Sequence, residues 1–124
     1  MKDDSEQFDM IEPLVERPWG SFHTLMSGKG FQVKKISVNP KSALSLQSHK
    51  FRSEFWVITK GQATVIVDGE TRLLGIQSSI EIPKEAIHRL QNDTDETLEI
   101  IELQWGDYLG EDDIIRLEDR YGRV

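Results

Sequence analysis

The chain has 124 residues and carries 15 Lys and Arg against 22 Asp and Glu, a formal net charge of −7. This length predicts one domain with one hydrophobic core, and the negative charge argues against a nucleic-acid partner, whose phosphates it would repel. The absence of cysteine excludes disulfides and thiolate metal sites and fits a reducing compartment. With neither an apolar signal segment nor a run of about 20 apolar residues, we expect a cytoplasmic protein without a membrane partner.

The first 16 residues are acidic and thinly apolar, and we interpret them as an N-terminal arm that docks on the body or on another subunit. A single domain is predicted over residues 17–124. It begins with Arg-Pro-Trp-Gly, where proline fixes φ and glycine permits a turn. β signals then dominate, because apolar, β-branched and aromatic runs alternate with turn residues. The predicted strands cover residues 21–26, 31–38, 55–59, 63–67, 71–74, 79–82, 86–90 and 98–104.

Many short strands, with almost no helical periodicity before residue 110, predict an all-β fold, either a sandwich or a barrel. Asp68-Gly69 is a favoured hairpin turn pair between two of these strands. The segment after Gly110 differs, since acidic residues come first and three apolar residues follow. This order predicts a short helix or an ordered tail.

A polar cluster interrupts the strands between residues 46 and 61. Gln47 and His49 lie two positions apart, so on an extended strand their side chains point to the same face. Glu54 would point to the opposite face of one straight strand, so the chain must turn or bulge before it if the three side chains converge. The distant His88 would then complete a four-ligand set for a metal ion. The alternative is an ordinary polar strand with a hydrogen-bonded histidine.

This spacing resembles the two signatures of the cupins, which are small double-stranded β-helix barrels. The first signature is Gly, five residues, His-x-His, three or four residues, Glu, six residues and Gly. Here Gln stands in place of the first His, and the matching residues are Gln47, His49, Glu54 and Gly61.

The second cupin signature is Gly, five residues, Pro-x-Gly, two residues, His, three residues and Asn. Pro83, His88 and Asn92 match it. Three residues stand where the two signatures prefer glycine, at positions that serve turn geometry and not ligation: Lys41, Gln77 and Glu85.

Longer blocks make the resemblance more specific: R-P-W-G-S-F, L-S-L-Q-S-H-K-F-R-S-E-F-W, I-P-K-E-A-I-H-R-L-Q-N and Y-L-G-E-D-D-I-I-R-L-E-D-R-Y-G-R. Over residues 17–123 the chain resembles type II mannose-6-phosphate isomerases, which form the C-terminal cupin domain of bifunctional mannose-1-phosphate guanylyltransferases and also occur alone. The resemblance implies a cupin barrel that interconverts mannose 6-phosphate and fructose 6-phosphate. The guanylyltransferase activity is not expected, because that domain is absent. Relatives often carry further histidines where this chain has Lys50, Phe51 and Phe55.

The resemblance implies a metal site made by Gln47, His49, Glu54 and His88. Two imidazoles, a carboxylate and an amide suit Zn²⁺, Mn²⁺, Fe²⁺ or Co²⁺, and their mixed hardness does not select one ion. A divalent ion on the sugar oxygens would stabilise the enediol(ate) through which aldose and ketose interconvert.

The phosphate requires cations, above all arginine with its bidentate geometry. Arg52, Arg89 and Arg116 are the candidates, and Arg52 is the first choice because it lies beside the ligands. A general base is also required. The candidates for a catalytic group are Lys35 and Arg52, since no carboxylate besides the expected ligand Glu54 identifies itself.

Two other functions stay open. One is a non-catalytic cupin that binds a sugar phosphate or nucleotide sugar, or that assists a separately encoded guanylyltransferase. The other is a different small-molecule metalloenzyme on the same barrel, such as a dioxygenase. In each case the expected partner is a small molecule, and the acidic arm and exposed β edges predict a homodimer.

Overall fold

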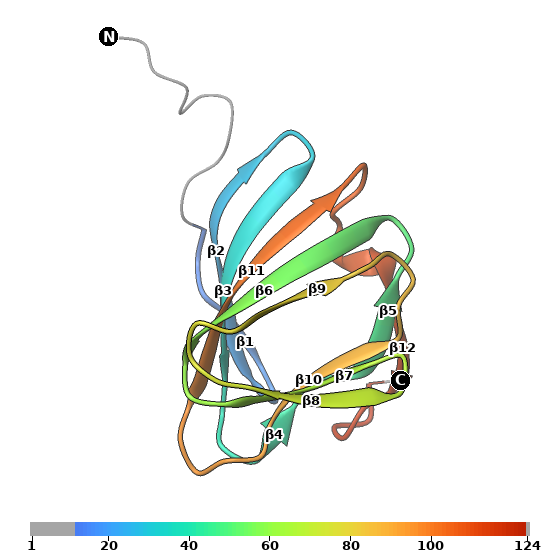
Figure 1. The fold of residues 1–124 in the computed structure, drawn as a ribbon. Helices are drawn as coiled ribbons and strands as arrows, with labels where there is room; N and C mark the ends of the chain where they lie inside the picture. The colour runs from blue at the N-terminus through green and yellow to red at the C-terminus, as the bar shows by residue number, and fades with distance from the viewer. Residues whose placement is uncertain (1–11, 124) are drawn as a thin grey trace, which may run out of the picture.

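In the computed structural model, which describes residues 12–123, the chain folds into two β-sheets that face each other across a central space, here called the lumen (Figure 1). One sheet has the strand order β1-β2-β3-β11-β6-β9 and the other β12-β5-β10-β7-β8, with β4 beside β10. The strands of the first sheet are β1 (Val15–Arg17), β2 (Gly20–Gly28), β3 (Phe31–Val38), β11 (Leu98–Gly106), β6 (Arg52–Lys60) and β9 (Ser79–Ile82). Those of the second are β12 (Ile114–Glu118), β5 (Leu46–His49), β10 (His88–Asn92), β7 (Ala63–Val67) and β8 (Glu70–Leu74), with β4 at Ser42–Ala43.

The all-β prediction is confirmed, and each predicted strand coincides with an observed one apart from shifts at its ends. The hairpin predicted at Asp68-Gly69 joins β7 to β8, with φ of 47° and 86° at its two residues. Positive φ at both central residues is the requirement of the two-residue turn that matches strand twist.

The two ends of the domain differ in how far the predictions can be compared with the structure. Residues 1–11 of the predicted arm lie outside the described residues, while Val15–Arg17 pairs with β2 as strand β1. At the other end, the helical part of the tail is the single 3₁₀ turn η2 (Glu111–Asp113), and strand β12 follows it. The backbone groups of β12 pair with β5, and this pairing outweighs the local helix signal. Within residues 12–123, no helix is long and apolar enough to span a bilayer.

Turn geometry explains why the cupin signatures prefer glycine at the three positions where this chain departs from them. Lys41, Gln77 and Glu85 have φ of 56°, 75° and 66°, the left-handed region that favours glycine. A residue with a Cβ costs roughly 1–2 kcal/mol in this region, so the chain keeps the backbone path of the signature at some cost in stability. Gly61 retains the glycine, with φ of 82°, and a Cβ there would lie 2.9 Å from the Thr97 carbonyl oxygen.

The hydrophobic core fills one end of the lumen. Inward-pointing residues of β3, β6 and β11 pack there beside Trp19 and side chains of the opposite sheet. Their fully or almost fully buried members include Ile36, Val38, Ile58, Val65, Leu90, Leu98 and Ile100. At the other end of the same strands the inward side chains are polar, and these form the candidate site.

Candidate metal centre

The predicted ligands come together because consecutive strands lie in opposite sheets. β5 ends at His49 and β6 starts at Arg52, so the chain crosses the lumen between them and Glu54 faces back toward Gln47 and His49. His88 begins β10 and lies directly opposite Gln47 in the β5–β10 pairing. The turn required by the spacing is therefore present, and all four side chains are buried.

His49, Glu54 and His88 form a compact donor cluster whose candidate ligand atoms all lie within 4.8 Å of one another. The Nδ1 atom of His49 is 3.4 Å from Oε2 of Glu54, and Nε2 of His88 is 4.0 Å from Oε1 of the same carboxylate. Two imidazole nitrogens and one carboxylate at this separation fit a divalent first-row metal ion with open coordination positions.

Hydrogen bonding prepares His88 as a ligand, and burial keeps both histidines neutral. Nδ1 of His88 donates to the Ala86 carbonyl oxygen at 2.9 Å, which leaves the lone pair on Nε2 for the site. Burial lowers the pKa of His88, and burial followed by the positive charge of Arg52 lowers the pKa of His49 to about 3. Both rings are therefore neutral near pH 7, and only a neutral imidazole can bind a metal ion.

Gln47 lies on the wall of the same cavity. Its Nε2 donates to Oγ of Ser45 at 2.9 Å, so the amide oxygen is the end left for a ligand. In the sheet Gln47 has His88 on one side and Arg116 on the other. It thus links the donor cluster to the part of the cavity that holds Arg116.

Arg52 is buried directly against the cluster. Its Nε donates to Oε2 of Glu54 at 2.8 Å, and its Nη2 donates to Nε2 of His49 at 2.8 Å. Burial alone would lower the pKa of Arg52, but the carboxylates of Glu54 and Glu102 raise it. The remaining nitrogen, Nη1, is buried without a hydrogen-bond partner among the described residues. Arg52 therefore lies in the site as predicted, although two of its nitrogens are already engaged by the cluster.

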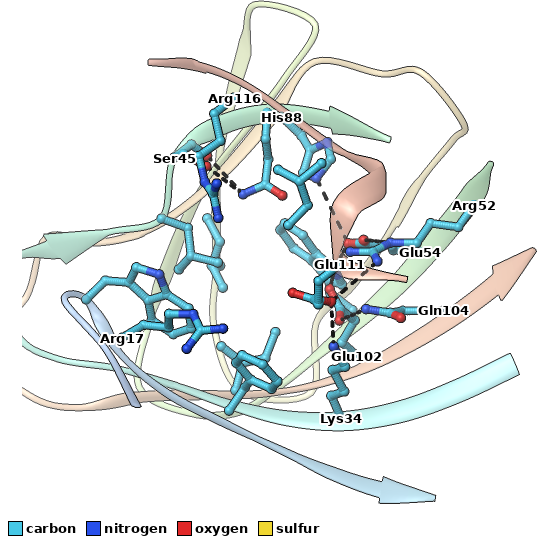
Figure 2. A pocket seen from close by; sticks show the side chains of 18 of the residues that line it. Arg17, Lys34, Ser45, Arg52, Glu54, His88, Glu102, Gln104, Glu111 and Arg116 are labelled. Carbon is cyan, nitrogen blue, oxygen red and sulfur yellow. Dashed lines mark hydrogen bonds and ion pairs between the residues drawn. The ribbon is translucent and has the colours of Figure 1, made fainter. Parts of the chain in front are cut away.

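The cluster opens into a cavity between the two sheets (Figure 2). A second polar group lines this cavity on β3 and β11. Oε1 of Glu102 accepts a hydrogen bond from Gln104 at 2.6 Å, and Nζ of Lys34 pairs with Glu111 at 2.9 Å. Burial, followed by the charge of Glu54, raises the pKa of Glu102 to about 8. Burial opposes ionisation of Glu111, but Lys34 and Arg52 lower its pKa.

The other predicted cations divide between the cavity and the outside. Arg116 lines the cavity, and its Nε is buried without a partner among the described residues. Arg89 is not among the lining residues, because its guanidinium bonds to the Leu44 carbonyl oxygen and to Glu118 and so holds β12 onto the barrel. The placement of Lys35 corrects its prediction as a catalytic group. Lys35 points away from the lumen and lies 3.7 Å from Glu99, while its neighbour Lys34 faces the cavity.

Several cavity residues were missed by the sequence analysis: Arg17, Lys34, Glu102, Gln104, Glu111 and Arg123. A signal for some of them was present as imperfect alternation. In β11 the inward residues change from Leu98 and Ile100 to Glu102 and Gln104. Such a change within one strand marks the level at which the core gives way to a site.

Solved structures with a similar arrangement of strands are cupins. An RmlC-like cupin from Shewanella frigidimarina matches with a TM-score of 0.69 over 81% of this chain and 86% of that chain, at 17% identity. Bacillus subtilis oxalate decarboxylase, described with Mn(II) centres, matches with a TM-score of 0.72 over 86% of this chain and 30% of that chain, at 19% identity. These likenesses show the fold alone, and that fold is the one found in cupins.

Within the cupins, the family described as "Mannose-6-phosphate isomerase C-terminal" matches residues 3–119, and the chain belongs to this family. The chain is 48% identical over 110 residues to mannose-1-phosphate guanylyltransferase ManC of Salmonella typhimurium and 52% identical over 110 residues to alginate biosynthesis protein AlgA of Pseudomonas aeruginosa. Each match covers 89% of this chain and 23% of the relative. The chain thus spans about a quarter of the length of these relatives, and the resemblance stated from the sequence is confirmed.

Proposed function

We propose that this domain is a metal-dependent sugar-phosphate isomerase that interconverts mannose 6-phosphate and fructose 6-phosphate. One observation carries the proposal: Glu54 and His88 of the donor cluster line the same cavity as two arginines, Arg17 and Arg116, that form no ion pair within residues 12–123. Membership of the isomerase family supports the choice of substrate.

Zn²⁺, Mn²⁺, Fe²⁺ or Co²⁺ would be held by His49, Glu54 and His88, with the amide oxygen of Gln47 as a fourth donor. When bound, such an ion supplies a Lewis acid that polarises the sugar carbonyl and favours the negative charge of the enediolate. The neutral imidazoles and the carboxylate group of the cluster match this requirement.

The residues around the cluster supply binding and orientation. In Figure 2, Arg17 and Arg116 lie apart from the carboxylates Glu54 and Glu102. We assign the phosphate to Arg17 and Arg116, since guanidinium groups bind phosphate oxygens bidentately. Nη1 of Arg52, which has no hydrogen-bond partner among the described residues, is the donor we assign to a sugar oxygen beside the cluster.

Turnover by metal-loaded protein tests the proposal. Purified protein reconstituted with each of the four ions should convert mannose 6-phosphate to fructose 6-phosphate in a coupled assay, and His88→Ala should lose both bound metal and turnover. Elemental analysis of wild type and variant reports metal content independently of activity. Binding of mannose 6-phosphate by the metal-loaded wild type, without turnover with any of the ions, would overturn the isomerase proposal.

A non-catalytic sugar-phosphate-binding cupin is the second candidate, and the position of Arg52 favours it. Its guanidinium hydrogen-bonds to both His49 and Glu54, so the metal-free cluster is already neutralised by an internal cation. In that case calorimetry should give the same affinity for mannose 6-phosphate with and without metal, and the turnover assay should give no product.

A further inference from the structure

Isomerisation moves one proton between two neighbouring carbons, so the cavity must supply a group that accepts and returns it. Among the described residues, three carboxylates line the cavity: Glu54, Glu102 and Glu111. Glu54 belongs to the donor cluster, and Glu111 is bound to Lys34 at 2.9 Å with a half-exposed side chain. Of the three, Glu102 is the one that neither belongs to the donor cluster nor pairs with Lys34.

The surroundings of Glu102 hold it firmly beside the donor cluster. The indole Nε1 of Trp56 donates to Oε2 of Glu102 at 3.1 Å and also to Oε1 of Glu54 at 2.9 Å. One N–H group therefore connects the two carboxylates, and Trp56 lies opposite Glu102 in the β6–β11 pairing. Glu102 is buried, with 5% of its surface exposed, and it forms no ion pair within the described residues.

The two oxygens of Glu102 accept separate hydrogen bonds, Oε2 from Trp56 and Oε1 from Gln104. These bonds fix the carboxyl group in the cavity wall, and a carboxyl group can accept at both oxygens, whereas an amide has one accepting oxygen and one donating nitrogen. Burying a group that can ionise costs more free energy than burying an amide, because the charged form loses its hydration. A carboxyl group held at this place beside the donor cluster, without an ion pair among the described residues, is positioned to exchange a proton with a bound sugar.

We infer that Glu102 transfers the proton between C2 and C1 of the sugar phosphate, an assignment that rests on the proposed isomerase function. In the aldose-to-ketose direction, the C2–H bond breaks and the proton passes to the Glu102 carboxylate. The released electron pair forms the C1–C2 double bond, and the carbonyl pair moves onto O1. The proton on O2 then passes to O1, C2=O forms, and the C1–C2 pair takes the proton back from Glu102 at C1. Glu102 returns to a carboxylate, and no co-reactant is consumed.

Glu102→Gln tests this assignment, because it preserves shape and removes the proton acceptor. In metal-loaded protein, kcat for mannose 6-phosphate should fall by at least about a hundredfold, while bound metal and KM change less than about threefold. In D₂O, wild type should place deuterium at C1 of the fructose 6-phosphate it forms, and the variant should not catalyse this exchange. The matched control is Glu99→Gln on the outer face of the same strand, which should keep wild-type kcat.

A second variant covers the case in which Glu102→Gln does not fold. Glu102→Ala leaves a space beside Trp56, and added formate should restore turnover in proportion to its concentration. If wild type is active, two results would overturn the assignment. One is a Glu102→Gln variant that keeps kcat within tenfold of wild type and still exchanges the proton. The other is a folded, metal-loaded Glu102→Ala variant whose turnover formate does not restore. Inactive wild type would instead overturn the isomerase function itself, so the two failures are distinguishable.

Discussion

The two ends of the lumen are built from the same strands but hold opposite kinds of side chain. Along β3, β6 and β11, cross-strand partners at one end are apolar on every strand, as in the row Ile36, Ile100 and Ile58. At the next inward level the row is Lys34, Glu102 and Trp56, and beyond it Gln104 lies opposite Glu54.

The change from apolar to polar occurs at the same level on neighbouring strands, which separates the two tasks of the barrel. The apolar end removes hydrocarbon from water and stabilises the fold. The polar end buries charges, which contributes little net stability even where they are paired. The comparison teaches that a substitution at the apolar end should change stability, whereas one at the polar end should change binding and chemistry.

Glu54→Ala should produce the largest combined effect, because it removes a member of the donor cluster and leaves Arg52 buried beside His49 without its carboxylate. We expect loss of bound metal and turnover, and a loss of roughly 3–5 kcal/mol of stability in the metal-free protein. Elemental analysis and urea unfolding measure the two losses. The control is Glu99→Ala on the outer face, which should lower the free energy of unfolding by less than about 1 kcal/mol. If Glu54→Ala instead retains metal at full stoichiometry, the assigned cluster is contradicted.

Ile100→Ala, one inward level from Glu102 on β11, should affect stability alone. Truncating this fully buried side chain is expected to cost about 2–5 kcal/mol, while the metal content of the folded protein stays unchanged. The matched control is Ile101→Ala, whose half-buried side chain faces outward and should cost less. Loss of metal from folded Ile100→Ala would show that the two ends are not independent.

In the metal-free protein, acid should lower the free energy of unfolding through His49 at the polar end. The pKa of His49 is about 3 in the folded state against 6.5 for an unperturbed histidine, so between these values only the unfolded state binds the proton. This contribution to stability is complete above pH 6.5 and decreases by about 1.4 kcal/mol for each pH unit below about 6. Unfolding curves from pH 7 to pH 5 for wild type and His49→Gln measure it. A stability difference between the two proteins that stays constant over this range would refute the prediction.

The smallest expected effect lies outside both ends, at the turn before β9. Gln77→Gly should stabilise the protein by up to about 1 kcal/mol, because it relieves a left-handed conformation and this gain is only partly offset by the greater freedom of glycine in the unfolded state. Thermal unfolding checks the sign. Gln62→Gly, at an exposed position without positive φ, is the control and should destabilise instead. Destabilisation of similar size in both variants would argue against strain at Gln77.

The sequence predicted the fold and the donor cluster because both follow from short-range spacing. The alternating strands, the Asp68-Gly69 turn and the cupin signatures each depend on a few neighbouring residues. The two signatures together also indicated that His88 joins a cluster that lies far from it in the sequence. Family resemblance supplied the proposed substrate class, which spacing alone could not.

The rest depended on strand pairing that the sequence did not reveal. Lys34 and Lys35 are adjacent, and only the register of β3 against β11 decides which one faces the cavity. Glu102 is one of two glutamates on β11, and its importance emerges only once Trp56 and Glu54 lie beside it. The tail forms strand β12 because β5 offers backbone partners, a tertiary effect that overrides the local helix signal.

The shared hydrogen bond of Trp56 gives this protein a built-in optical probe. Trp56 contacts the edge of the His88 ring at a centroid distance of 5.7 Å and donates its N–H to both Glu54 and Glu102. Whatever binds to these groups changes the electric field on the indole, so its ultraviolet absorption and emission respond to occupancy without any label. Trp105, which is 52% exposed on the outer surface, serves as the reference, whereas Trp19 lines the same cavity and would respond as well. Spectra of single-tryptophan variants would then separate filling of the site from changes elsewhere in the barrel.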